Sequence, residues 1–188
     1  EEGSSATLIN SIIVERQNGT VINQGRRTEM TFTSDNKLIV LCIAPQLDGG
    51  YWRVVPRLYK GTIQEWIDGE QTELDKPIDQ DESVEDYDFA RGQGYYSVSL
   101  AAHPTNQGKA YVGGINLFSS NTSGDNWGQL THRNGRYAQY VHADHHSVIF
   151  NKNNTQQMLV GSDGGVSYAA MAGILETRNN KFHTSQYY

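Results

Sequence analysis

Three histidines and an aspartate lie within five positions of this sequence, as His142, Asp144, His145 and His146. If residues 140–150 form an extended strand, His142, Asp144 and His146 point to one face because side chains alternate along a strand. Imidazole and carboxylate groups are ligands for Zn²⁺ and similar ions, so this face is a candidate metal site. Alternate side chains start about 7 Å apart, which favours instead a hydrogen-bonded network in which the aspartate fixes a histidine tautomer. The network is our interpretation, and the metal site is its alternative.

Two aspartates of this region, Asp144 and Asp163, are the candidate catalytic carboxylates. Hydrolysis of a glycosidic bond normally needs two such groups, roughly 5 to 10 Å apart, one as acid and the other as base or nucleophile. Asp163 begins the sequence Asp-Gly-Gly, where an aspartate side chain commonly caps the backbone of a tight turn. The sequence therefore leaves catalysis open for both residues.

Tyrosines beside glycine-rich segments suggest a third kind of chemistry, which is binding without catalysis. Aromatic faces with polar rims suit sugar rings or protein partners, although most aromatic side chains of small β-sheets lie in the core. The predicted ligand-binding residues are Tyr96, Tyr140, His142, Asp144, His145 and His146.

The elements that must position these residues are predicted to be β-strands. Around the histidines, the predicted strands are residues 140–150, 157–161 and 166–169. In the preceding unit they are residues 96–102, 109–113, 116–120 and 127–131. The Gly164-Gly165 pair suits a tight hairpin between the last two strands around the histidines. Val112 and Val160 occupy matching places in the two units, 48 positions apart, and a recurrence of about 40 to 50 residues is typical of radial β repeats.

Four segments carry a resemblance to a known family. HADHHSVIF and MLVGSDGGVSYA, with GQGYYSVSLAAHP and AYVGGINLF upstream, resemble secreted sialidase-like β-propellers with Asp-box (BNR) repeats. That group includes xyloglucan-cleaving glycosidases, sortilin-type propellers and many surface proteins of Bacteroidetes. The resemblance implies a secreted or cell-surface protein that recognises or processes extracellular glycans, with a polysaccharide or glycoprotein as partner. The alternative function is a non-catalytic adhesion or protein-assembly module.

The family's short motifs are matched only in part. Residues 120–127 resemble the Asp-box S-x-D-x-G-x-T-W, with Thr122 in place of the aspartate. Such boxes close a hairpin turn and are structural, and a threonine hydroxyl closes it more weakly. A sialidase would also need an arginine triad and a tyrosine nucleophile, and Arg133, Arg136 and Tyr137 do not form a pattern that carries these roles over. The resemblance therefore does not decide whether the chain is an enzyme.

The predicted fold is all-β, a partial β-propeller of about three four-stranded antiparallel blades. The predicted divisions are an N-terminal strand or extension at 1–25, a blade-like unit at 26–67 whose last strand is 63–67, an acidic loop insertion at 68–94, a second blade at 95–138, and a third blade at 139–188 that runs into a truncated next blade. Because propellers need roughly four to eight blades, we expect a fragment whose remaining blades belong to the parent protein or another chain.

Charge and hydropathy exclude some partners. Residues 68–88 carry ten of the 21 acidic residues beside a single lysine. Calcium or another divalent ion binds such oxygen-rich segments, but the spacing of an EF-hand loop is absent, so we expect a solvated, mobile insertion and no cofactor. The net charge of −6 argues against nucleic acid, whose phosphates need clustered basic residues. No apolar stretch reaches the roughly 18 residues needed to span a bilayer.

Overall fold

The computed structural model describes residues 14–15, 21–22, 27–48, 50–81, 84, 88–171 and 173–180. Sheet 1 contains β3 (Thr28–Phe32), β4 (Leu38–Asp48), β5 (Tyr51–Gly61) and β6 (Thr72–Leu74). Sheet 2 contains β7 (Ser99–Ala102), β8 (Ala110–Gly113), β9 (Leu117–Ser120) and β10 (Gly128–Gln129). Sheet 3 contains β13 (His145–Asn151), β14 (Asn154–Ser162), β15 (Gly165–Ala169) and β16 (Glu176–Thr177). The smaller pairs are the antiparallel β1 (Val14–Glu15) with β2 (Val21–Ile22) and the parallel β11 (Thr131–His132) with β12 (Gln139–Tyr140).

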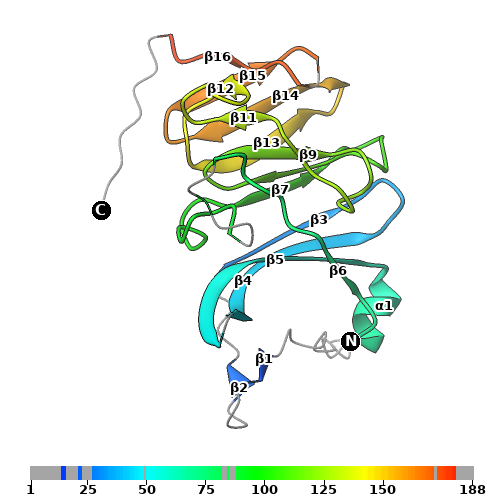
Figure 1. Cartoon of the computed structure of the whole chain (residues 1–188). Coiled ribbons are helices and arrows are strands. Elements are labelled where there is room, and N and C mark those ends of the chain that lie inside the picture. The colour runs from blue at the N-terminus through cyan, green and yellow to red at the C-terminus, as the bar shows by residue number, and fades with distance from the viewer. Residues whose placement is uncertain are drawn as a thin grey trace, which may run out of the picture.

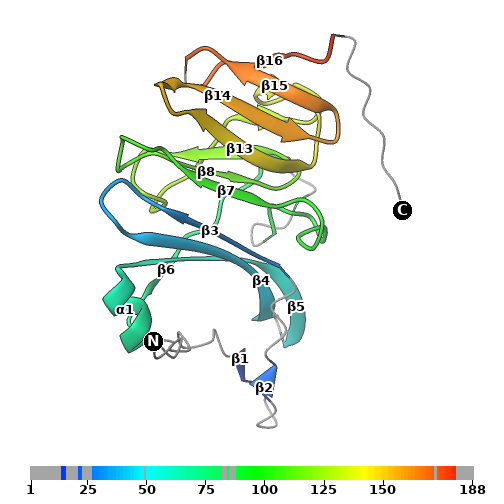
Figure 2. The ribbon, with the colours of Figure 1, turned by 180° about the vertical axis from the view of Figure 1, so that it is seen from behind.

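The three large sheets are antiparallel meanders that stack in chain order (Figure 1, Figure 2). Their first strands are neighbours, because β7 contacts both β3 and β13. Meanders of four strands whose first strands gather on one side are the blades of a β-propeller. The chain is therefore an all-β partial propeller of three blades, as the sequence predicts. No helix in the described residues is long and apolar enough to cross a membrane.

The strand β4 explains why sheet 1 forms, because its side chains are buried on both faces. The alternating residues Ile39, Leu41 and Ile43 belong to a core cluster shared with Phe118 of sheet 2. Leu38, Val40 and Cys42 face the other way and form a second cluster with Tyr59 and Trp66. A strand buried on both sides reads as a continuous apolar run, and residues 38–44 are such a run.

The segment predicted as the fourth strand of the first blade is a helix. Residues 63–68 form α1 (Ile63–Asp68), and the fourth strand of sheet 1 is β6. The N–H of Glu65 donates to the Thr62 hydroxyl at 3.2 Å, and the N–H of Thr62 donates to the Glu65 carboxylate at 2.6 Å. This capping box fixes the start of the helix, and Trp66 is buried against sheet 1. The strand prediction at 63–67 is therefore wrong.

Sheets 2 and 3 approach each other closely at Gly113. A Cβ atom at this position would lie 2.3 Å from Oγ of Ser99 and 2.7 Å from Cβ of His145. We expect Gly113→Ala to lower the free energy of unfolding by about 1–3 kcal/mol, because overpacked cores must shift their backbone or rotamers. Urea denaturation measures the loss. Gly128→Ala is the matched control, since its nearest neighbour would be 3.9 Å away, and equal losses in the two variants would contradict the argument.

Candidate functional site

One edge of the sheets collects the segments that connect them. Antiparallel strands alternate in direction, so the hairpins between second and third strands leave from the same edge as the connections between sheets. We call this edge the loop face. Its components are residues 79–81, 88–98 and 130–144, from the segments that connect the sheets, and the turns at 114–116 and 163–164.

Asp163, in the turn between β14 and β15, is the centre of a polar cluster on the loop face. Its Oδ1 accepts hydrogen bonds from the Tyr96 hydroxyl, at an O···O distance of 2.9 Å, and from Nε2 of His146, at an N···O distance of 2.7 Å. The rings of Tyr96 and His146 meet edge to face, with centroids 5.0 Å apart. The His146 and Asp163 side chains are 32% and 29% exposed. The structure therefore brings three predicted site residues together within reach of a ligand.

The bond to Asp163 determines which nitrogen of His146 is free. Because a carboxylate only accepts hydrogen bonds, neutral His146 donates from Nε2 and keeps a lone pair on Nδ1. In the described part of the chain, neither this Nδ1 nor Oδ2 of Asp163 has a hydrogen-bond partner. The cluster thus presents two acceptors to hydroxyl groups of a ligand.

Arg27 ties this cluster to sheet 1. Its guanidinium group donates to the backbone oxygen of Tyr96 and, at 3.0 Å, to that of Val98. The same group pairs with Glu29 at 3.0 Å. Arg27 therefore holds the residues that lead into β7, and through them it positions the Tyr96 hydroxyl.

The structure does not place His142 and Asp144 on a strand face with His146. Strand β13 begins only at His145, and Asp144 has a φ of 66°, which breaks the alternation expected of residues 140–150. His142 instead lies over Gly164: a Cβ atom added to Gly164 would be only 2.2 Å from the Cβ of His142. No three His, Cys, Asp or Glu side chains of the described residues converge as metal ligands. The shared face proposed for His142, Asp144 and His146 is therefore wrong.

The two candidate catalytic carboxylates are neighbours in the backbone but differ in their surroundings. The N–H of Asp163 donates to the backbone oxygen of Asp144 at 3.2 Å. Both residues are partly exposed, but Oδ1 of Asp144 is buried and has no partner among the described residues, whereas Oδ1 of Asp163 accepts two hydrogen bonds. Asp163, and not Asp144, therefore belongs to the hydrogen-bonded cluster on the loop face.

His145 lies behind this cluster in the interface between sheets 2 and 3. It is fully buried, and its Nε2 hydrogen-bonds the Thr131 hydroxyl at 3.2 Å. The Thr131 oxygen also accepts the N–H of Leu117 at 2.9 Å. Burial lowers the pKa of His145 to about 3, and electrostatic repulsion from the neighbouring imidazoles of His146 and His142 acts in the same direction. His145 is therefore neutral and connects the sheets. Of the other predicted residues, Tyr140 on β12 is exposed, and so is His142.

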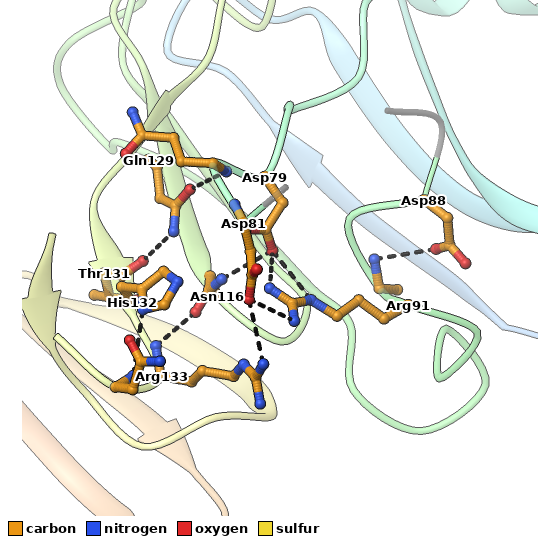
Figure 3. Close-up of polar contacts among 12 residues, drawn as sticks. Asp79, Asp81, Asp88, Arg91, Asn116, Gln129, Thr131, His132 and Arg133 are labelled. Carbon is orange, nitrogen blue, oxygen red and sulfur yellow. Dashed lines mark hydrogen bonds and ion pairs between the residues drawn. The ribbon is translucent and has the colours of Figure 1, made fainter. Parts of the chain in front are cut away.

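A second polar cluster on the loop face was not predicted (Figure 3). The Asp79 side chain is 0% exposed, and its Oδ2 accepts from Arg91 Nη2 at 2.7 Å and Asn116 Nδ2 at 2.9 Å. Asp81 pairs with Arg91 at 3.3 Å and with Arg133 at 3.2 Å. The expectation of a solvated, mobile acidic stretch is wrong for Asp79 and Asp81, because these partners hold both residues in place.

This Asp79 cluster joins the two inter-sheet segments to sheet 2. Asn116 donates to Asp79 and, through Oδ1, accepts the N–H of Arg133 at 2.8 Å. Asn116 is a polar residue that is fully buried between the apolar residues Ile115 and Leu117. A buried amide needs hydrogen-bond partners, so this lone asparagine in an apolar turn is the sequence signal that could have revealed the cluster. The two arginines neutralise the two aspartates, so the cluster braces the loop face.

Comparisons with known proteins identify no family. No protein-family model matches the sequence, and no curated protein is significantly similar to it. Among solved structures, the chain is similar to YCF48 bound to a D1 peptide, with 13% identity and a TM-score of 0.44 over 82% of this chain and 40% of that one. It is also similar to the GH74 enzyme of Niastella koreensis, with 14% identity and a TM-score of 0.40 over 79% of this chain and 24% of that one. The chain spans less than half the length of either structure, and at these scores neither likeness carries an argument about function.

Proposed function

We propose that the loop face binds an extracellular glycan, as part of a secreted or cell-surface protein. The observation that carries this proposal is the partly exposed cluster of Tyr96, His146 and Asp163. Sugar hydroxyl groups are donors, and the free Nδ1 of His146 and Oδ2 of Asp163 are acceptors. The hydrogen bonds from His146 and Tyr96 to Oδ1 of Asp163 hold these acceptors in fixed positions. A polyhydroxylated ligand therefore suits this cluster.

Exposed tyrosines on the same face support a sugar ligand. Tyr95 is 62% exposed beside Tyr96, and Tyr140 is 58% exposed on β12. Tyr137 is held by Arg136, whose guanidinium carbon lies 5.0 Å from the ring centroid. Aromatic rings cover the apolar C–H face of a sugar while their surroundings remain wet. The three tyrosines belong to the segments that connect the sheets, so they offer apolar platforms on the same face as the polar cluster.

The arrangement favours recognition over hydrolysis. Cleavage by a pair of carboxylates needs both groups beside the scissile bond. Oδ1 of Asp144 is buried, and Asp163 already accepts hydrogen bonds from Tyr96 and His146. Release of reducing sugars from a polysaccharide, lost in Asp163→Asn, would contradict a purely binding role.

We expect Asp163→Asn to weaken glycan binding at least tenfold. A hydrogen bond to a charged group is worth about 1.5–3 kcal/mol, and about 1.4 kcal/mol is a factor of ten in affinity. Isothermal titration calorimetry with cello-, xylo- and manno-oligosaccharides measures the loss. The control is Asp35→Asn, which removes the same charge from the turn between β3 and β4, at the opposite edge of sheet 1. Equal affinities of Asp163→Asn and the unaltered chain would refute the site.

A second candidate function is assembly with other β-sheets, without glycan binding. The outward face of sheet 3 carries an apolar groove of about 280 Å³ lined by Ile149, Leu159 and Tyr168 among others. Ile149 is 60% and Leu159 44% exposed, although the equivalent faces of sheets 1 and 2 are covered. The remaining blades of a parent propeller, or another chain, would suit this groove. Saturable protein binding at this face in a chain that binds no oligosaccharide would favour this alternative.

A further inference from the structure

A separate pocket lies on the outer rim between sheets 1 and 2. It has a volume of about 440 Å³ and is lined by Asp75, Lys76, Ile78, Asp125, Asn126 and Trp127. We call it the rim pocket. Residues 75–78 follow β6 and residues 125–127 precede β10, and these are the outermost strands of their sheets. The volume lies in the range of roughly 300–1,000 Å³ that is typical of small-molecule sites.

Hydrogen bonds fix one wall of the rim pocket in place. The indole N–H of Trp127 donates to the backbone oxygen of Asp75 at 3.0 Å, so the ring is held against the segment after β6. The N–H of Asn126 donates to the Thr122 hydroxyl at 2.9 Å. A Cβ atom on Gly124 would lie 3.3 Å from the Trp127 ring, which shows that the turn packs tightly beneath the indole. The wall is therefore preorganised, which lowers the entropic cost of binding.

The charges around the rim pocket are balanced. Lys60 pairs with Asp125 at 2.7 Å, and Lys76 donates to the side-chain oxygen of Gln46 at 2.7 Å. Two ammonium groups thus accompany the two carboxylates Asp75 and Asp125. Because no net charge accumulates, the pocket favours an uncharged polar ligand over a free cation or anion.

The free polar groups of the rim pocket adjoin an apolar surface. The Asp75 carboxylate and the Asn126 side-chain amide make no hydrogen bond to other described residues. Ile78 is 61% exposed next to the partly buried Trp127. A carboxylate accepts from hydroxyl groups, an amide both donates and accepts, and an indole ring covers C–H groups. This combination matches a sugar ring, which has hydroxyl groups at its edge and C–H groups on its faces.

We infer that the rim pocket binds one sugar unit of an uncharged glycan, at a site separate from the loop-face cluster. The two sites share no residue, and either can fail without the other. Asp75 and Asn126 receive and orient the hydroxyl groups, while Trp127 and Ile78 cover the apolar face of the ring.

The experiment is NMR titration of the folded chain with cello-, xylo- and manno-oligosaccharides, following the indole N–H resonance of Trp127. A saturable shift of this resonance is expected with at least one of them. Asp75→Asn should weaken the affinity measured at this resonance at least tenfold. Asn126→Ala, which keeps the backbone N–H that bonds Thr122, should weaken it several-fold.

Two matched variants separate this site from the rest of the chain. Asp163→Asn should leave the titration at the Trp127 resonance unchanged, and so should Asp35→Asn. Circular dichroism confirms that each variant is folded. The inference is overturned if no oligosaccharide shifts the Trp127 resonance, if both pocket variants bind like the unaltered chain, or if the shift disappears in Asp163→Asn and not in Asp75→Asn.

Discussion

Replacing Asp79 with alanine will lower the free energy of unfolding by about 3–5 kcal/mol, the range found when one partner of a buried ion pair is removed. The Asp79 carboxylate is fully buried and accepts from Arg91 and Asn116. Without it, the Arg91 guanidinium, whose side chain is mostly buried, faces Asp81 alone, and the Asn116 amide has no acceptor. Urea denaturation monitored by circular dichroism measures the change.

The control for Asp79 is an exposed aspartate that also makes an ion pair. Asp125 pairs with Lys60 at 2.7 Å, but its side chain is 58% exposed, so Asp125→Ala should cost about 0–1 kcal/mol. If Asp79→Ala were no more destabilising than Asp125→Ala, the Asp79 cluster would not brace the loop face.

Acid will destabilise the chain through histidines that are buried between sheets 2 and 3. Burial lowers the pKa of His145 from 6.5 to about 3, and it also lowers the pKa of His103. In His103, Nε2 donates to the Thr155 oxygen at 2.9 Å while Nδ1 accepts from the backbone, so the neutral ring fits its surroundings. A histidine with a lowered pKa binds fewer protons in the folded state than in the unfolded state. Its contribution to stability is therefore complete above pH 6.5 and is lost as the pH falls from 6.5 towards 3.

His145→Gln isolates this contribution from that of the carboxylates. One pKa unit corresponds to about 1.4 kcal/mol, so His145 alone accounts for several kcal/mol of acid sensitivity. Glutamine can still bond Thr131 but cannot become charged, so the variant should be less stable at pH 8 and lose stability more slowly below pH 6.5. Urea denaturation at pH 8, 7, 6, 5 and 4 compares the two chains. Parallel curves for the two chains would show that His145 does not titrate on unfolding.

The meander, its repeat and its hairpins could be predicted because they depend on local patterns. Val112 and Val160 do lie on second strands, in β8 and β14, and the Asp-Gly-Gly sequence does turn between β14 and β15. The helix α1 was missed because its six residues are too few to separate a helical from a strand pattern. The available signal for a helix was the capping-box pair, with Thr62 just before the segment and Glu65 three positions later within it.

The site could be predicted only where its residues are close in the sequence or share a recognisable turn. His146 and Asp163 were found because both belong to such segments. The predicted strand face through His142 and Asp144 is wrong because Asp144 has a left-handed backbone conformation, which interrupts the alternation of side chains. Aspartate can adopt this conformation, so no glycine marks the position in the sequence. The Asp79 cluster joins residues up to 52 positions apart, so its charges looked like an isolated acidic run.

The groove on sheet 3 has a practical consequence for anyone who purifies this chain. Met171 and Ile174, in the connection between β15 and β16, are also largely exposed and extend the apolar character of this end of the stack. Contiguous apolar surfaces promote association in water. At high concentration the chains will therefore tend to associate through sheet 3. Dilute conditions or a mild detergent will keep them apart for spectroscopy.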